Sequence, residues 1–97
     1  MSALWIAHVT VTDAEAYDRY AALAGPAIAA HGGVFLARAT RYVQLEGNDR
    51  ARNVVARFPS VEAAVACYNS AEYQAAMSHA KGAAERDLVV VEESPAT

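Results

Sequence analysis

The sequence predicts a single α+β domain spanning residues 1–97, and two observations point to it. Short segments rich in β-branched and aromatic residues alternate with longer segments whose apolar residues recur every three or four positions. Their order is strand, helix, strand, strand, helix, strand, with no visible repeat, linker or low-complexity segment. This order is the β-α-β-β-α-β pattern of a ferredoxin-like sandwich with an antiparallel sheet, in which both helical regions cover one face.

The first strand and the first helix follow each other directly. Residues 4–11 alternate partly and are rich in strand formers, and residues 12–15, Thr-Asp-Ala-Glu, form a capping-box pattern that starts a helix. Gly32 and Gly33 predict its end, and Gly25-Pro26 predicts a kink within it. One face of this helix carries residues at three- and four-residue steps: Tyr17, Tyr20, Ala24, Ala27 and His31.

The middle of the chain predicts two further strands. Residues 34–39 form the first, with residues 42–45 as its continuation or a short extra strand, and residues 46–49 have turn composition. Residues 53–58 form the next strand.

The second helical region is predicted in two parts. Pro59-Ser60 starts a helix, and Asn69-Ser70 interrupts it with a fresh cap. The expected inner face of the first part is Val61, Ala64, Val65 and Tyr68. That of the second part is Tyr73, Met77, Ala80 and Ala84.

The last strand predicts a homodimer. Residues 88–91 are four consecutive apolar residues, a pattern typical of a strand that is covered on both faces. Because both helical regions lie on one side of the sheet, we expect a second copy of the sheet to cover the other side. The expected core spans residues 4–93, followed by a loose tail over residues 94–97.

Composition excludes several classes of partner. The formal net charge of −3 is spread without runs of one sign, so we expect no nucleic acid and interpret most of the arginines between residues 38 and 57 as solvated surface. No apolar stretch reaches the length of a membrane span, and the first residues lack the pattern of a signal peptide. We therefore expect a cytoplasmic protein that does not enter a membrane, and the single Cys67 agrees with this as a small packed residue.

Motifs for metals and cofactors are missing from the sequence. His8, His31 and His79 are widely separated and fit no close-spaced metal pattern. No glycine-rich nucleotide loop or nucleophile elbow is present. We expect neither a metal nor a cofactor.

The candidate ligand site lies between the first helix and the sheet. Tyr17, Tyr20 and His31 share the buried helical stripe, so their polar atoms need partners there, with Arg38 as an anion partner and Tyr73 as a further ring. Each also has a structural interpretation: the tyrosines as core rings, and His31 as a polar helix end favoured by the helix dipole. His31 and Glu46 are candidates for moving a proton, although Glu46 is also explained as a turn carboxylate.

A different set of polar residues is expected on the opposite face of the sheet. Strand alternation points Ile6, His8 and Thr10 to one side, next to Asn53, Val55 and Arg57 or their neighbours. This face fits a dimer interface as well as a binding site.

The chain resembles the family known as domain of unknown function 1330, within the dimeric α/β-barrel group, over residues 4–93. Six segments carry the resemblance: Tyr17-Asp18-Arg19-Tyr20, His31-Gly32-Gly33, Glu46-Gly47, Phe58-Pro59-Ser60 with Ala64, Asn69-Ser70-Ala71-Glu72-Tyr73, and the strand from Asp87 to Glu92. The resemblance implies the fold and the dimer. The family commonly has an arginine seven positions after the last tyrosine, where this chain has Ala80 between His79 and Lys81.

Three functions are compatible with the sequence. The first is a homodimer that binds a small apolar or aromatic metabolite between helices and sheet. The second, by analogy with related dimeric barrels, is a cofactor-free enzyme resembling monooxygenases or isomerases. The third is a structural or regulatory dimer without a ligand.

Overall fold

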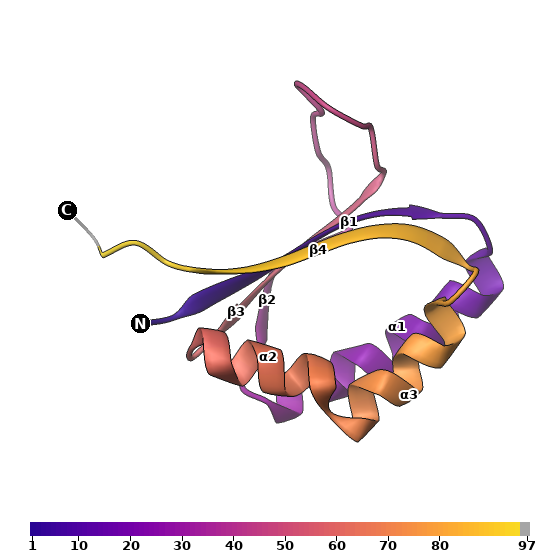
Figure 1. Ribbon diagram of the computed structural model, residues 1–97. Helices are drawn as coiled ribbons and strands as arrows, with labels where there is room; N and C mark the ends of the chain where they lie inside the picture. Colours follow the sequence, from indigo (N-terminus) through magenta and orange to yellow (C-terminus); the bar gives the residue numbers. More distant parts are fainter. Residues whose placement is uncertain (96–97) are drawn as a thin grey trace.

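The protein is a two-layer slab with one sheet and one layer of helices. The computed structural model describes residues 1–95 and measures 41 × 35 × 17 Å along its principal axes. All helices lie on one side of the sheet, and a long loop projects from the other side (Figure 1). The predicted ferredoxin-like α+β architecture is confirmed.

The antiparallel sheet has the strand order β2-β3-β1-β4. Its strands are β1 (Ala3–Val11), β2 (Val34–Arg38), β3 (Arg52–Phe58) and β4 (Ala84–Glu92). The central strand β1 pairs with β3 on one side and with β4 on the other, so that His8 lies opposite both Asn53 and Asp87. The sheet therefore sets in one row three polar residues that are far apart in sequence.

Helix α1 (Ala14–Ala30) is continuous through Pro26. It begins at Asp13, whose carboxylate accepts a hydrogen bond from the backbone N–H of Ala16 at 3.2 Å, so the predicted cap at Thr12 was one residue early. Gly32 ends the helix with φ of +83°, a conformation that glycine adopts at little cost. Gly33 has a different role, because a Cβ there would lie 2.5 Å from the side chain of Ile28.

The second helical region consists of α2 (Val61–Asn69) and α3 (Ala71–Ala80), as predicted. Ser60 and Ser70 cap them by accepting hydrogen bonds from backbone N–H groups. One detail of α2 differs from the prediction. The buried face of α2 is Ala64 and Cys67, while Val65 and Tyr68 are partly exposed.

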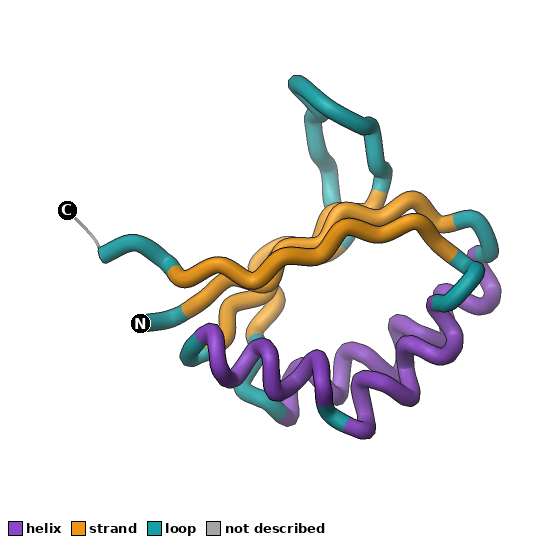
Figure 2. The backbone as a smooth tube through the Cα atoms, viewed as in Figure 1, coloured by secondary structure: helices purple, strands orange, loops and turns teal. Residues whose placement is uncertain are grey.

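Ala84 begins β4 instead of continuing α3, because Gly82 takes a left-handed conformation with φ of +75° and turns the chain into the sheet. Residues 39–51 form a loop with no strand, so the predicted strand over residues 42–45 was wrong (Figure 2). Beyond β4, residues 93–95 have no regular structure, and positions 96–97 of the predicted tail lie outside the described residues.

The core lies between the sheet and the helices. Its largest fully buried side chains are Trp5, Tyr73, Phe58, Val9 and Cys67. The Trp5 and Tyr73 rings meet edge to face at 5.1 Å between centroids, a geometry that adds about 0.5–1.5 kcal/mol beyond the area buried. Small alanines on α1 and α3 let these helices pack together over the sheet. Within residues 1–95, no helix is long and apolar enough to cross a membrane.

Candidate functional site

A pocket lies between α1 and the sheet, where the sequence placed its candidate site. Its polar wall consists of Tyr17 and Tyr20 from α1 with Arg38, Arg52 and Arg86 from three different strands. Apolar side chains close the rest, among them Trp5, Val9, Ile28, Phe35 and Val54. The interior holds about 20 Å³ of free space, room for about one water molecule, and the pocket opens to solvent.

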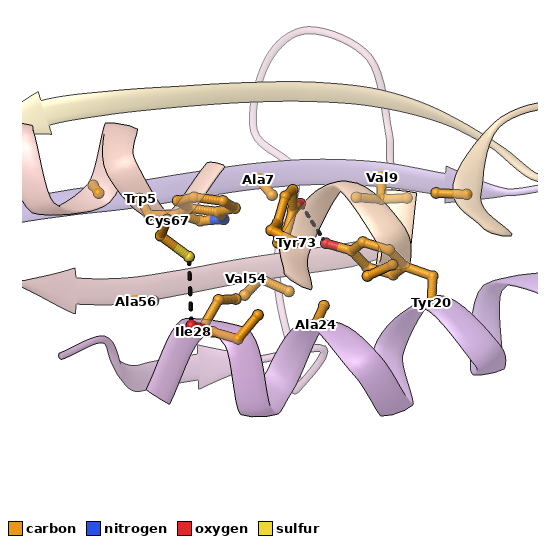
Figure 3. Packing of buried hydrophobic residues seen from close by; sticks show 14 of the residues in the cluster. Trp5, Ala7, Val9, Tyr20, Ala24, Ile28, Val54, Ala56, Cys67 and Tyr73 are labelled. Atoms are coloured by element: carbon orange, nitrogen blue, oxygen red, sulfur yellow. Dashed lines mark hydrogen bonds between the residues drawn. The ribbon is translucent and has the colours of Figure 1, made fainter. Parts of the chain in front are cut away.

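Two tyrosines and an arginine form a hydrogen-bonded cluster at one end of this pocket. The hydroxyls of Tyr20 and Tyr73 lie 2.6 Å apart and point toward each other from α1 and α3 (Figure 3). Arg86 Nη2 donates to both hydroxyls, at 2.9 Å to Tyr20 and 3.1 Å to Tyr73. Its Nη1 reaches the sulfur of Met77 at 2.7 Å, so the guanidinium is anchored from three sides.

The cluster keeps its protonation states fixed near neutral pH. Burial is the main cause that raises the pKa of Tyr20, and the neighbouring Tyr73 hydroxyl adds to it. Burial also raises the pKa of Tyr73. For Arg86, burial acts to lower the pKa, but the surrounding tyrosine oxygens outweigh it and the pKa is raised. The tyrosines are therefore neutral hydrogen-bonding groups, and Arg86 is a permanent cation.

Two further arginines complete the positive wall. The guanidinium of Arg52 lies 5.3 Å from the centre of the Tyr17 ring, and that of Arg38 lies 4.1 Å from the centre of the Phe35 ring. Arg38 also packs against α1 at Gly25, where a Cβ would lie 3.2 Å from its Nη2. Gly25 thus leaves room for the guanidinium beside the helix.

An irregularity in β2 puts Arg38 on the helix side. Phe35 lies opposite Ala56, but Ala37 lies opposite Val55, so two steps along β2 match one step along β3. This is a β-bulge, in which the extra residue changes the alternation of side chains. As a result, Phe35 and Arg38 share one face although they are three positions apart.

The structure brings most of the predicted ligand residues together. Tyr17, Tyr20 and Arg38 line the pocket. Tyr73 is not in the lining, but its hydroxyl forms a hydrogen bond with that of Tyr20. His31 is not part of the lining: its Nδ1 lies 2.9 Å from the carbonyl oxygen of Ala27, at the end of α1.

Glu46 is exposed in the loop of residues 39–51. This loop projects from the side of the sheet opposite the helices (Figure 1). Neither His31 nor Glu46 reaches the tyrosine and arginine cluster. The geometry therefore gives no support to either residue as a proton carrier for this pocket.

Arg52 and Arg86 are pocket residues that the sequence analysis missed. Both lie in phase with inward-facing residues: Arg52 with Val54 and Ala56, and Arg86 with Leu88 and Val90. Side chains alternate between the two faces along a strand. Continuing this alternation two residues back from each apolar run would have placed Arg52 and Arg86 on the helix side. The guanidinium beside Tyr73 comes from β4, while Ala80 on α3 is buried without a charge.

A second polar cluster lies on the open face of the sheet. His8 Nδ1 lies 2.6 Å from Asn53 Oδ1, as expected from their predicted common face. Arg50, from the end of the long loop, forms ion pairs with Asp87 at 3.1 Å and with Glu85 at 3.4 Å. These contacts pair Arg50 with two acids on the open face of the sheet.

The buried thiol does not belong to either site. Cys67 is fully buried in α2, and its Sγ lies 3.7 Å from the carbonyl oxygen of Ala27 (Figure 3). Burial raises its pKa to about 11. The thiol is thus protonated and inert near neutral pH, as predicted for a packing residue.

The architecture and the pocket define the protein as a ferredoxin-like α+β domain with a tyrosine and arginine pocket under its first helix. The chain belongs to the family described as Domain of unknown function (DUF1330), whose model matches residues 2–94. No match was found among curated protein sequences.

Solved structures share the fold. A protein of unknown function from Rhodopseudomonas palustris is 22% identical with a TM-score of 0.78, covering 98% of this chain and 84% of its own. SnoaB, a cofactor-independent oxygenase from Streptomyces nogalater, is 11% identical with a TM-score of 0.65, covering 98% and 95%. A dimeric ferredoxin-like protein of unknown function from Thermobifida fusca is 16% identical with a TM-score of 0.58, covering 96% and 92%. At these identities the likeness concerns the fold alone.

Proposed function

We propose that the protein is a homodimer that binds a small aromatic metabolite in the pocket between α1 and the sheet. The observation that carries the ligand proposal is the convergence of two tyrosines and three arginines on one pocket. A mostly apolar pocket with a few placed polar groups is the usual form of a small-molecule site. Because the interior now has room for about one water, a ligand must also occupy the open mouth beside Phe35 and Arg38.

The binding experiment compares two phenylalanine substitutions on α1. Ala21 lines the pocket, whereas its neighbour Ala22 is exposed on the other side of the helix. In a thermal-shift screen of small aromatic compounds, a compound that stabilises the wild type should lose its effect in Ala21→Phe and keep it in Ala22→Phe. A panel with no stabilising compound, or equal stabilisation of both variants, would contradict the proposal.

The homodimer is supported by the open face of the sheet. Val89 and Val91 on β4 are 55% and 46% exposed there, next to the outward-facing Leu4 and Ile6 of β1. Such a contiguous apolar face is typical of an interaction surface. A dimeric state is also named for the ferredoxin-like protein from Thermobifida fusca.

Light scattering tests the dimer, with an expected mass of twice the 10.3 kDa chain. Val89→Lys should shift the mass toward the monomer, because a charge on this face loses its hydration in the interface. Val65→Lys is the matched control, since Val65 is 44% exposed on α2 in the helix layer. A wild type that stays monomeric at micromolar concentration would contradict the proposed homodimer.

Binding without catalysis is favoured by the chemistry of the cluster. A cofactor-free oxygenase or isomerase needs a group that removes a proton from its substrate. The raised pKa values of Tyr20 and Tyr73 keep both hydroxyls neutral, so neither serves as a base near pH 7. Oxygen uptake with a panel of phenols and quinols, without added cofactor, would reveal the catalytic alternative.

A further inference from the structure

We propose that the pocket is an oxyanion site, and that its ligand is a small aromatic acid whose carboxylate is held by Arg52 and Arg86. This inference rests on the proposed function and names the class of its ligand. It specifies that the aromatic metabolite is an anion.

The pocket holds positive charges that no acidic side chain in its wall balances. Arg38, Arg52 and Arg86 all line the pocket, which has no aspartate or glutamate in its wall. None of the three has a carboxylate within 4 Å among residues 1–95. Arg50 and Arg57, on the other face of the sheet, are both paired with acids. The chain thus leaves three cations together without a counter-charge, although it pairs similar ones elsewhere.

Partial burial makes this arrangement costly unless an anion is present. Arg52 and Arg86 are each only partly exposed, and removing a cation from water is unfavourable without a partner. Contacts with the rings of Tyr17 and Tyr20 offset part of that cost. They do not change the net charge of the pocket, which a bound carboxylate would reduce.

Two of the pocket arginines also have hydrogen-bond donors without an acceptor among the described residues. The Nε atoms of Arg52 and Arg86 are buried and have no hydrogen-bond partner within the described residues. Buried guanidinium N–H groups are normally satisfied, so these two call for an acceptor. A carboxylate accepts only, and it is the planar group that best matches a guanidinium.

The size of the pocket separates the head of the ligand from its body. The interior is of the order of one water molecule, which suits a small polar head and excludes a ring. A ring would instead lie at the mouth, near the exposed Arg38 and the half-buried Phe35. The geometry therefore points to an aromatic acid with its carboxylate inward and its ring toward solvent.

The experiment is a titration of the protein with sodium benzoate, monitored by calorimetry at constant ionic strength. Benzamide is the neutral probe of the same shape. Benzoate should bind and benzamide should not. Arg52→Gln should weaken benzoate binding by roughly tenfold or more, as expected for losing a hydrogen bond to a charged group. Arg57→Gln is the matched control, because it removes the same charge from the opposite face of the same strand and should leave binding unchanged.

Three other outcomes would overturn the oxyanion site. Benzamide binding as tightly as benzoate, with Arg52→Gln unaffected, would overturn the oxyanion site but leave a small-molecule pocket standing. Equal weakening by Arg52→Gln and Arg57→Gln would reduce the effect to general electrostatics and overturn the site. Absence of binding by benzoate and by benzamide, together with no stabilising compound in the thermal-shift screen, would overturn both the oxyanion site and the proposed function.

Discussion

Substitutions of Tyr73 test how the core and the pocket cluster are coupled. Tyr73 is fully buried, and its ring contacts Trp5, Tyr20 and Tyr68 at centroid distances of 5.1, 5.9 and 5.4 Å. Tyr73→Ala removes the ring and leaves a cavity, for which large aromatic-to-alanine changes cost about 3–5 kcal/mol of unfolding free energy. The free energy of unfolding of a domain of this size is only about 5–15 kcal/mol, so this variant should keep little of its stability.

Tyr73→Phe isolates the hydroxyl. It keeps the ring but removes an oxygen that accepts from Arg86 and bonds with Tyr20. Hydrogen bonds to charged groups contribute about 1.5–3 kcal/mol, and the bond from Arg86 to Tyr20 at 2.9 Å remains, so we expect about 1.5–2 kcal/mol. The ring then accounts for the larger share of the Tyr73→Ala effect.

Urea unfolding monitored by circular dichroism measures both changes, at one fixed protein concentration because subunit association contributes to stability. Tyr42→Ala is the control, since Tyr42 lies in the exposed loop and its hydroxyl bonds only with Asp49 among the described residues. It should shift stability by no more than about 0.5 kcal/mol. A Tyr73→Ala effect in that same range would refute the packing argument, and equal effects of Phe and Ala would refute the division between ring and hydroxyl.

Three further predictions concern other parts of the molecule. Gly33→Ala should destabilise by about 1–3 kcal/mol in thermal melts, because its Cβ would overlap the side chain of Ile28, and an unchanged midpoint would contradict this. Cys67 has a folded pKa of about 11, above its ordinary value of 9.0, so the thiol favours the folded state below pH 9 and this advantage is lost as pH rises toward 11. Cys67→Ala should therefore lose less stability than the wild type over that range. The hydrogen bond from Arg57 lowers the pKa of Glu93, so this pair stabilises the fold above the ordinary value of 4.5 and loses that effect in acid. Arg57→Gln should therefore reduce the loss of stability between neutral and acid pH. Parallel curves of stability against pH for the variant and the wild type would exclude the effect.

Local signals in the sequence predicted most of the fold. Gly32 at the end of α1 and the serine caps of α2 and α3 act through neighbouring backbone groups, so they can be read without the tertiary structure. The predicted strand at residues 42–45 failed for the opposite reason. Its Tyr42 and Val43 have strand propensity, but a strand also needs a partner, and within residues 1–95 no strand pairs with this segment.

The site was predictable in part. Helical spacing placed Tyr17 and Tyr20 on the buried stripe of α1, because that periodicity is a property of one segment. The meeting of Arg38, Arg52 and Arg86 depends on the order of the strands and on the bulge in β2, which no single segment encodes. Only alternation within β3 and β4 could have indicated which face two of these arginines take.

The bulge in β2 has a consequence for insertions and deletions in this edge strand. Removing one residue from a regular strand reverses the facing of every residue on one side of the cut. At the bulge the strand already contains one residue more than its partner, and Leu36 lies within it with 48% of its surface exposed. Deleting Leu36 should therefore restore a regular ladder while leaving Phe35 and Arg38 opposite Ala56 and Val54, on the pocket side. This edge of the sheet can change its length by one residue and keep the charge of the pocket.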